Sequence, residues 1–104
     1  MKTIKSINEY NSIVNQGKTV LLDFYADWCG PCRTQLPILD QLSQKVSDDI
    51  IIAKVNVDTQ PELARQFGVR SIPTIAIIEN GDVKYQKSGV HTEHVLNDLL
   101  SVTA

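Results

Sequence analysis

Two stretches of this 104-residue chain are almost continuously apolar. They cover residues 19–26 and 50–57. The first begins with a threonine and is then interrupted only by Asp23, and the second is interrupted only by Lys54 and Asn56. Strands covered on both faces of a parallel sheet carry such runs, whereas strands with one wet face alternate apolar and polar residues. We therefore expect both stretches to be central, parallel strands.

Apolar residues recur at helical spacing between these two strands. Leu36, Leu39, Leu42 and Val46 mark the inner face of a long helix, and Pro37 is expected to bend it. A strand, a helix and a second strand in this order predict a β-α-β unit.

Two capping patterns predict further helices. Ser6 and Glu9 have the spacing of a capping box, in which each side chain satisfies the free amide of the other, ahead of a first helix that ends by Gly17. Thr59 and Glu62 repeat this spacing ahead of a short helix that ends near Gly68.

The second half of the chain predicts a hairpin and a final helix. Asn80-Gly81 is typical of a type I′ turn and joins the expected strands 74–78 and 83–88 in antiparallel order. A last helix from about Thr92 presents one apolar face, formed by Val95, Leu96, Leu99 and Leu100. The predicted fold class is therefore α/β, with a mixed central sheet flanked by helices on both faces.

The length of the chain, its net charge and its apolar stretches limit the classes of function that it can have. A chain of this length fits one compact domain, which we expect to span residues 1–104. A net charge of −2 with scattered basic residues argues against nucleic acid as a partner. No apolar stretch approaches the length of about 18 residues that spans a membrane, and the first residues lack the apolar segment of a signal peptide. We expect a cytoplasmic protein without membrane contact.

The two cysteines carry the candidate chemistry. They lie in Trp28-Cys29-Gly30-Pro31-Cys32, directly after the first apolar strand. Thiols at i and i+3 face each other one helical turn apart, so they can close a disulfide with little backbone movement. A helix N-terminus favours thiolate at Cys29, the expected nucleophile, and leaves Cys32 deeper as the resolving thiol. Pro31 suits a first helical turn, and Gly30 leaves the first sulfur open to another chain.

Other uses of these residues have weaker support. A zinc site would need His91 and His94, but both lie far beyond Cys32 and only three positions apart, so we expect ordinary polar histidines at the start of the last helix and no metal. Arg33 stands where haem attachment requires histidine. The chain has no nucleotide-binding or nucleophilic-serine motif, and we predict no bound cofactor.

Segments along the whole chain resemble the thioredoxin family. The likeness is carried by residues 23–33, 37–40, 54–58, 67–74 and 80–89, in the same order and with nearly the same spacing as in that family. It implies a thioredoxin fold and a monomer that acts as a general protein disulfide reductase. It also implies that disulfide-containing proteins are substrates and that thioredoxin reductase supplies electrons, by an NADPH or a ferredoxin route.

The resemblance also gives roles to the two charged residues in the apolar strands. It implies that Asp23 is buried beneath Cys32 and exchanges protons with it, and that Lys54 lies close by and modulates Asp23. Burial disfavours the carboxylate charge, so the pKa of Asp23 should be raised. The alternative is that each side chain points outward at an end of the sheet.

A peptide-binding surface is implied in the same way. The resemblance predicts a cis bond before Pro73 and main-chain pairing of Ile72 with an extended substrate, although the frequency of cis bonds alone favours trans. Trp28, Gly30, Pro31, Ile72 and Gly89 would form the contact surface. The alternative for Trp28 is packing in the core.

Some positions depart from the commonest family pattern. They are Tyr25, Thr34-Gln35-Leu36, Ile78, Glu79 and Ser88, which we expect around the docking surface, where they bear on the choice of partners. Two alternatives to a reductase stay open: an oxidase or isomerase, which the redox potential distinguishes, and a redox-insensitive binding subunit that uses the same surface.

Overall fold

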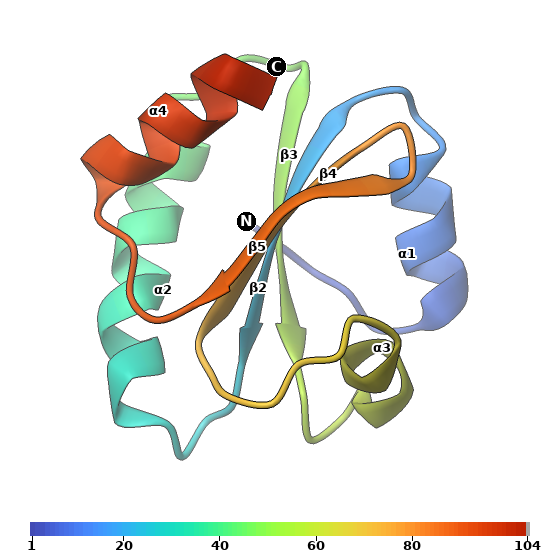
Figure 1. The fold of residues 1–104 in the computed structure, drawn as a ribbon, viewed down its shortest axis with the longest axis vertical. Coiled ribbons are helices and arrows are strands. Elements are labelled where there is room, and N and C mark those ends of the chain that lie inside the picture. The colour runs from blue at the N-terminus through green and yellow to red at the C-terminus, as the bar shows by residue number, and fades with distance from the viewer. Residues whose placement is uncertain (104) are drawn as a thin grey trace.

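The computed structural model describes residues 1–103, which form a five-stranded sheet with helices on both faces (Figure 1). The elements in chain order are β1 (Lys2–Thr3), α1 (Ile7–Val14), β2 (Thr19–Tyr25), α2 (Gly30–Ser43), β3 (Ile50–Asn56), α3 (Pro61–Gln66), β4 (Thr74–Glu79), β5 (Asp82–Ser88) and α4 (Glu93–Thr103). Within this part of the chain, no helix has the length and apolar character needed to cross a membrane.

The sheet is mixed, as the sequence predicts. Its strand order is β1-β3-β2-β4-β5, with β1, β3 and β2 parallel and with β4 and β5 antiparallel to their neighbours. Every residue of β2 is buried, which explains its continuous apolar run. Strand β1 was not predicted, because two residues are too few to show an alternating pattern.

Two cores lie on opposite faces of the sheet. Even-numbered residues of β2 pack with α1 and α3 in a cluster that includes Leu22, Phe24 and Leu63. Odd-numbered residues face α2 and α4, where Leu21 packs with Leu39. Figure 1 shows the same division, with α1 and α3 on one side of the sheet and α2 and α4 on the other.

The helix ends differ from the predictions in three details. Ser6 Oγ accepts from the Glu9 amide at 3.0 Å as expected, but Glu9 Oε1 accepts from the Lys5 amide, one residue before the expected partner. Thr59 does not cap α3: its hydroxyl donates to the Asn56 carbonyl. Pro61 opens that helix instead, and its missing amide needs no cap.

The third detail concerns the end of α2. The helix runs through Pro37 and ends at Ser43, so Val46 lies beyond it, although this side chain still packs against the core.

Thr92 Oγ1 accepts from the Val95 amide and caps α4 at the predicted position. Asn80 and Gly81 have φ of 53° and 82°, the left-handed values that a type I′ turn requires.

Candidate active site

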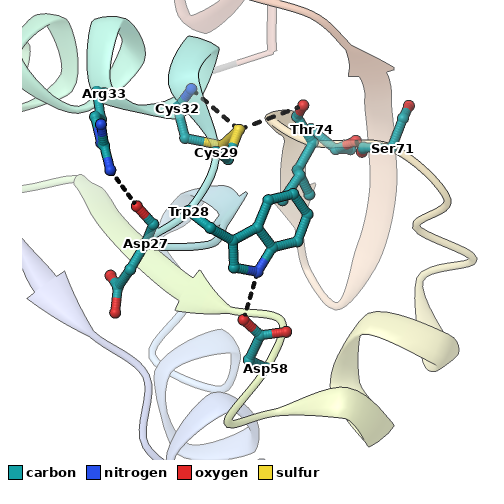
Figure 2. The surroundings of a disulfide bond; sticks show 9 residues. Asp27, Trp28, Cys29, Cys32, Arg33, Asp58, Ser71 and Thr74 are labelled. Atoms are coloured by element: carbon teal, nitrogen blue, oxygen red, sulfur yellow. Dashed lines mark hydrogen bonds between the residues drawn. A yellow bond between two sulfur atoms is a disulfide. The ribbon is translucent and has the colours of Figure 1, made fainter.

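Cys29 and Cys32 form a disulfide where β2 leads into α2 (Figure 2). Their Cα atoms are 5.3 Å apart, within the normal range for a bridged pair. Cys29 is the N-cap of α2, and its Sγ accepts a hydrogen bond from the Cys32 amide at 3.2 Å. The first turn of the helix is therefore directed at this sulfur.

This placement favours negative charge on Cys29. The first amides of a helix have no intrahelical acceptor and carry a positive partial charge, so they stabilise a nearby thiolate. Cys32 lies inside the first turn, with 1% of its surface exposed against 5% for Cys29. The order of exposure agrees with the prediction, but Cys29 is far less open in this oxidised state than we expected.

Neighbours on both sides cover the sulfurs. Tyr25 and Ala26 pack with the two cysteines, and the partly buried side chains of Leu36, Val57 and Ile72 complete the cluster. A Cβ built on Gly30 would meet nothing within 4 Å, so this glycine borders open space. Because glycine has no side chain, residue 30 does not obstruct the approach to the disulfide.

Asp23 lies in the centre of β2 and is completely buried. Neither of its carboxylate oxygens has a hydrogen-bond partner among the described residues. Burial, the larger effect, raises the pKa of Asp23 from 3.8 to about 7, although the charge of Lys54 acts to lower it. The alternative that Asp23 points outward at a sheet end is therefore wrong.

Lys54 is the register partner of Asp23 on the parallel strand β3. Because paired residues of neighbouring strands share a face, both side chains lie on the α2 side of the sheet, as does Tyr25. Lys54 is half-buried, and its Nζ lies 5.4 Å from the centre of the Tyr25 ring. Tyr25 in turn packs against the cysteines, which connects the charged pair to the disulfide.

Trp28 projects from the surface beside the disulfide, with 68% of its area exposed. Its indole Nε1 donates to Asp58 Oδ2 at 2.8 Å, which fixes the ring (Figure 2). Core packing of Trp28, the alternative from the sequence, is therefore wrong. Gly30 and Pro31 are exposed next to it.

The segment before β4 approaches the disulfide from the other side. The Ile72–Pro73 bond is cis, as the resemblance predicted. The Ile72 carbonyl oxygen lies 3.7 Å from Cys29 Sγ, and the Pro73 carbonyl accepts from the Gly89 amide at 2.8 Å. Gly89 has φ of 106°, which only glycine adopts without strain. Residues 72, 73 and 89 are thus brought together at the rim of the site.

Comparison with known proteins agrees with this geometry. The Thioredoxin family model matches residues 2–101. The chain belongs to the thioredoxin family. It is 35% identical to the thioredoxin of Rickettsia typhi, covering 97% of this chain and 96% of that one, and 35% identical to the thioredoxin of Bacillus subtilis, covering 97% of both. The crystal structure of Fasciola hepatica thioredoxin superposes with a TM-score of 0.91 and 28% identity over the full length of both chains.

Thioredoxins are thiol-disulfide oxidoreductases that act on protein disulfides and are reduced by thioredoxin reductase. In this chain the bonded Cys29–Cys32 pair provides the same two-electron couple. Within residues 1–103, no group of three or more His, Cys, Asp or Glu side chains is placed to hold a metal ion.

Several residues of this chain lie where the sequence analysis did not place them. His94 is exposed on α4 as expected, but His91 is buried, with 6% of its area exposed, and it precedes that helix. Ile78 and Glu79, expected around the docking surface, lie at the opposite end of the sheet: Ile78 is completely buried and pairs with Val20, and Glu79 ends β4. Gln35, also expected near the docking surface, is completely buried on α2. A single polar residue in a helical pattern is usually exposed, so the pattern held no signal for this burial.

Proposed function

We propose that this member of the thioredoxin family is a general protein disulfide reductase in which Cys29 attacks the substrate and Cys32 resolves the mixed disulfide. The observation that carries the proposal is the hydrogen bond from the Cys32 amide to Cys29 Sγ at the start of α2. Residues 1–104 act as one thioredoxin domain and one monomer. Ala104 lies outside the described residues.

The first step forms a mixed disulfide. In the reduced protein, the Cys29 thiolate attacks one sulfur of the substrate disulfide, forming a bond to that sulfur while the substrate S–S bond breaks. The other substrate sulfur leaves as a thiolate and takes a proton from solvent. Because only the thiolate is nucleophilic, stabilisation of Cys29 by the helix N-terminus raises the fraction of reactive protein.

The second step releases the substrate. Cys32 passes its proton to the Asp23 carboxylate and attacks Cys29 Sγ, which forms the Cys29–Cys32 disulfide and expels the second substrate thiolate. With a pKa of about 7, Asp23 is suited to accept a proton near neutral pH. Lys54 modulates Asp23 by favouring its charged form. The second substrate thiolate takes a proton from solvent, and Asp23 releases its proton to solvent. In total, two electrons pass to the substrate, and thioredoxin reductase returns two electrons to the Cys29–Cys32 disulfide.

Substrates dock on the rim of the disulfide. Trp28, Gly30 and Pro31 form one side, and Ile72, Pro73 and Gly89 form the other. The main chain of Ile72 pairs with an extended peptide, a form of recognition that tolerates many sequences. The exposed Trp28 ring and the open space at Gly30 support this docking surface.

The sequence supports a cytoplasmic location. Both cysteines belong to the redox pair, so the chain holds no structural disulfide, which suits a reducing compartment.

Reductase-coupled reduction of insulin tests the function. We expect steady turnover by the wild type and none by Cys29→Ser. In single-turnover experiments, Cys32→Ser should accumulate a covalent complex with the substrate that added thiol dissolves. Absence of that complex would contradict the assigned roles of the cysteines, and a strongly oxidising redox potential would favour an oxidase instead.

A further inference from the structure

A buried polar network joins α2 to the segment that follows β5. The Gln35 side chain binds the main chain of His91 twice: its Nε2 donates to the His91 carbonyl at 3.0 Å, and its Oε1 accepts from the His91 amide at 2.6 Å. Gln35 is completely buried and lies three residues after Cys32, on the same face of the helix. The cysteine-bearing helix therefore holds residue 91 directly.

The His91 ring extends this network to the rim. Its Nδ1 lies 2.8 Å from the Gly89 carbonyl oxygen, which only accepts, so Nδ1 is the donor. In the neutral ring, Nε2 then accepts from the Tyr85 hydroxyl at 2.8 Å. Both ring nitrogens are thus used, and their roles are set by their partners.

Gly89 is consequently held through both of its main-chain groups. Its amide donates to the Pro73 carbonyl, and its carbonyl accepts from His91. Pro73 follows Ile72, whose carbonyl lies against Cys29 Sγ. Figure 1 shows the segment between β5 and α4 passing beside α2. A continuous set of hydrogen bonds therefore connects α2 with the two rim segments that flank the disulfide.

We infer that Gln35 and His91 are positioning residues that fix the Gly89 side of the docking surface relative to the cysteines. The inference rests on the proposed function, because it assigns Gly89 to substrate docking. Neither side chain touches the reacting sulfurs in the hydrogen bonds described, so their effect is on binding of a protein substrate and not on the chemical step. A small disulfide that reaches Cys29 without using the rim should not depend on them.

Three variants separate the contacts. Gln35→Met keeps the volume and removes both bonds to the main chain of residue 91. His91→Leu removes both ring contacts, whereas His91→Asn keeps a donor near the position of Nδ1. His94→Leu is the matched control, because that histidine is exposed on α4.

The measurements are kcat and KM for insulin, the rate with a small aromatic disulfide, and hydrogen exchange of the Gly89 amide. For Gln35→Met and His91→Leu we expect KM for insulin to rise about three- to tenfold, the range that one lost hydrogen bond supports, with kcat and the small-disulfide rate unchanged. Hydrogen exchange of the Gly89 amide should be faster in both variants. His91→Asn should restore most of the wild-type KM for insulin, and the control His94→Leu should match the wild type in every measurement.

Unchanged KM and Gly89 exchange in Gln35→Met and His91→Leu would overturn the inference. So would an equal loss with insulin and with the small disulfide, which would mean that the cysteines themselves are disturbed. If a variant does not fold, Tyr85→Phe removes only the hydroxyl that His91 accepts from, and a smaller change in the same direction is expected. Failure of the wild type to reduce insulin would refute the proposed function, and Gly89 exchange would still test the positioning role.

Discussion

Asp23 is the residue whose chemistry depends most on its surroundings. A carboxylate inside an apolar strand loses its hydration, and neither oxygen gains a hydrogen bond among the described residues in return. The folded state therefore holds the proton up to about pH 7, whereas the ordinary pKa of an exposed aspartate carboxyl is 3.8. Between these values the folded state binds more protons than the unfolded chain, so stability falls as pH rises.

We predict that Asp23→Asn removes this pH dependence. At pH 4 both proteins carry an uncharged side chain, and their free energies of unfolding should be similar. By pH 8 the wild type should have lost about 4 kcal/mol relative to the variant, since each unit of pKa shift corresponds to about 1.4 kcal/mol. Urea unfolding of the oxidised proteins between pH 4 and pH 8 measures the difference, and parallel profiles would show that Asp23 titrates normally.

The same substitution should slow catalysis at the second step. Without a proton acceptor at residue 23, Cys32 attacks the mixed disulfide more slowly, by about 10²-fold if Asp23 acts as a general base. Rapid-quench measurement of the mixed disulfide should show that it persists longer in Asp23→Asn. An unchanged lifetime would remove Asp23 from the mechanism.

Lys54 acts on Asp23 in the opposite direction to burial. Its charge lowers the pKa of the carboxyl, so Lys54→Met should raise the pH at which Asp23 titrates above the wild-type value of about 7. Chemical shifts of the Asp23 carboxyl carbon during a pH titration report this directly. Lys45→Met is a suitable control, because Lys45 lies in an exposed ion pair with Glu93. A downward shift in Lys54→Met would contradict the electrostatic argument.

At the scale of the helices, the group that begins a helix depends on the local chemistry of its first residues and not only on the spacing of capping residues in the sequence. Ser6-x-x-Glu9 and Thr59-x-x-Glu62 share one pattern, yet only the first caps a helix through its hydroxyl. The difference lies in Pro61, which fixes the first turn of α3 and makes a hydroxyl cap unnecessary. The pattern locates both helices correctly and fails to identify the group that begins the second.

Ser6→Ala should therefore destabilise the protein more than Thr59→Ala. Loss of a hydroxyl cap costs about 1 kcal/mol, whereas Thr59 caps no helix. Thermal unfolding of the two variants at one pH provides the comparison. Equal losses would mean that the Ser6 hydrogen bond contributes nothing beyond that of an ordinary exposed hydroxyl.

For the whole molecule, the sequence predicts the architecture and much of the site because the signals are local. Buried strands, the hairpin turn, the helix that begins within the cysteine motif and the cis bond at Pro73 follow from runs, short motifs or family resemblance. The contact of Gln35 with His91 joins residues 56 positions apart. It also places a polar side chain at a buried position of α2, where a helical pattern would have an apolar residue. No spacing rule connects such a pair, so only the folded structure shows it.

The two cores share one sheet, and we predict that they unfold together. Phe24→Ala on the α1 side should cost about 3–5 kcal/mol and Leu39→Ala on the α2 side about 2–5 kcal/mol, since both side chains are fully buried. Trp28 fluorescence and far-ultraviolet circular dichroism should give coincident urea transitions in each variant. Val95→Ala, at a partly exposed position of α4, should change stability by no more than about 0.5 kcal/mol. Separate transitions would indicate two independently melting halves.

The outermost strands β1 and β5 have a consequence for colloidal behaviour. An unprotected strand at the margin of a sheet invites a neighbouring molecule to continue the hydrogen-bonded ladder, which is how fibrils and insoluble assemblies begin. On one margin β1 extends for only two residues, and on the other β5 carries exposed Lys84 and Lys87, whose charges repel an identical strand. If the chain pairs transiently with extended peptides, as we propose, these two margins discourage it from polymerising with itself.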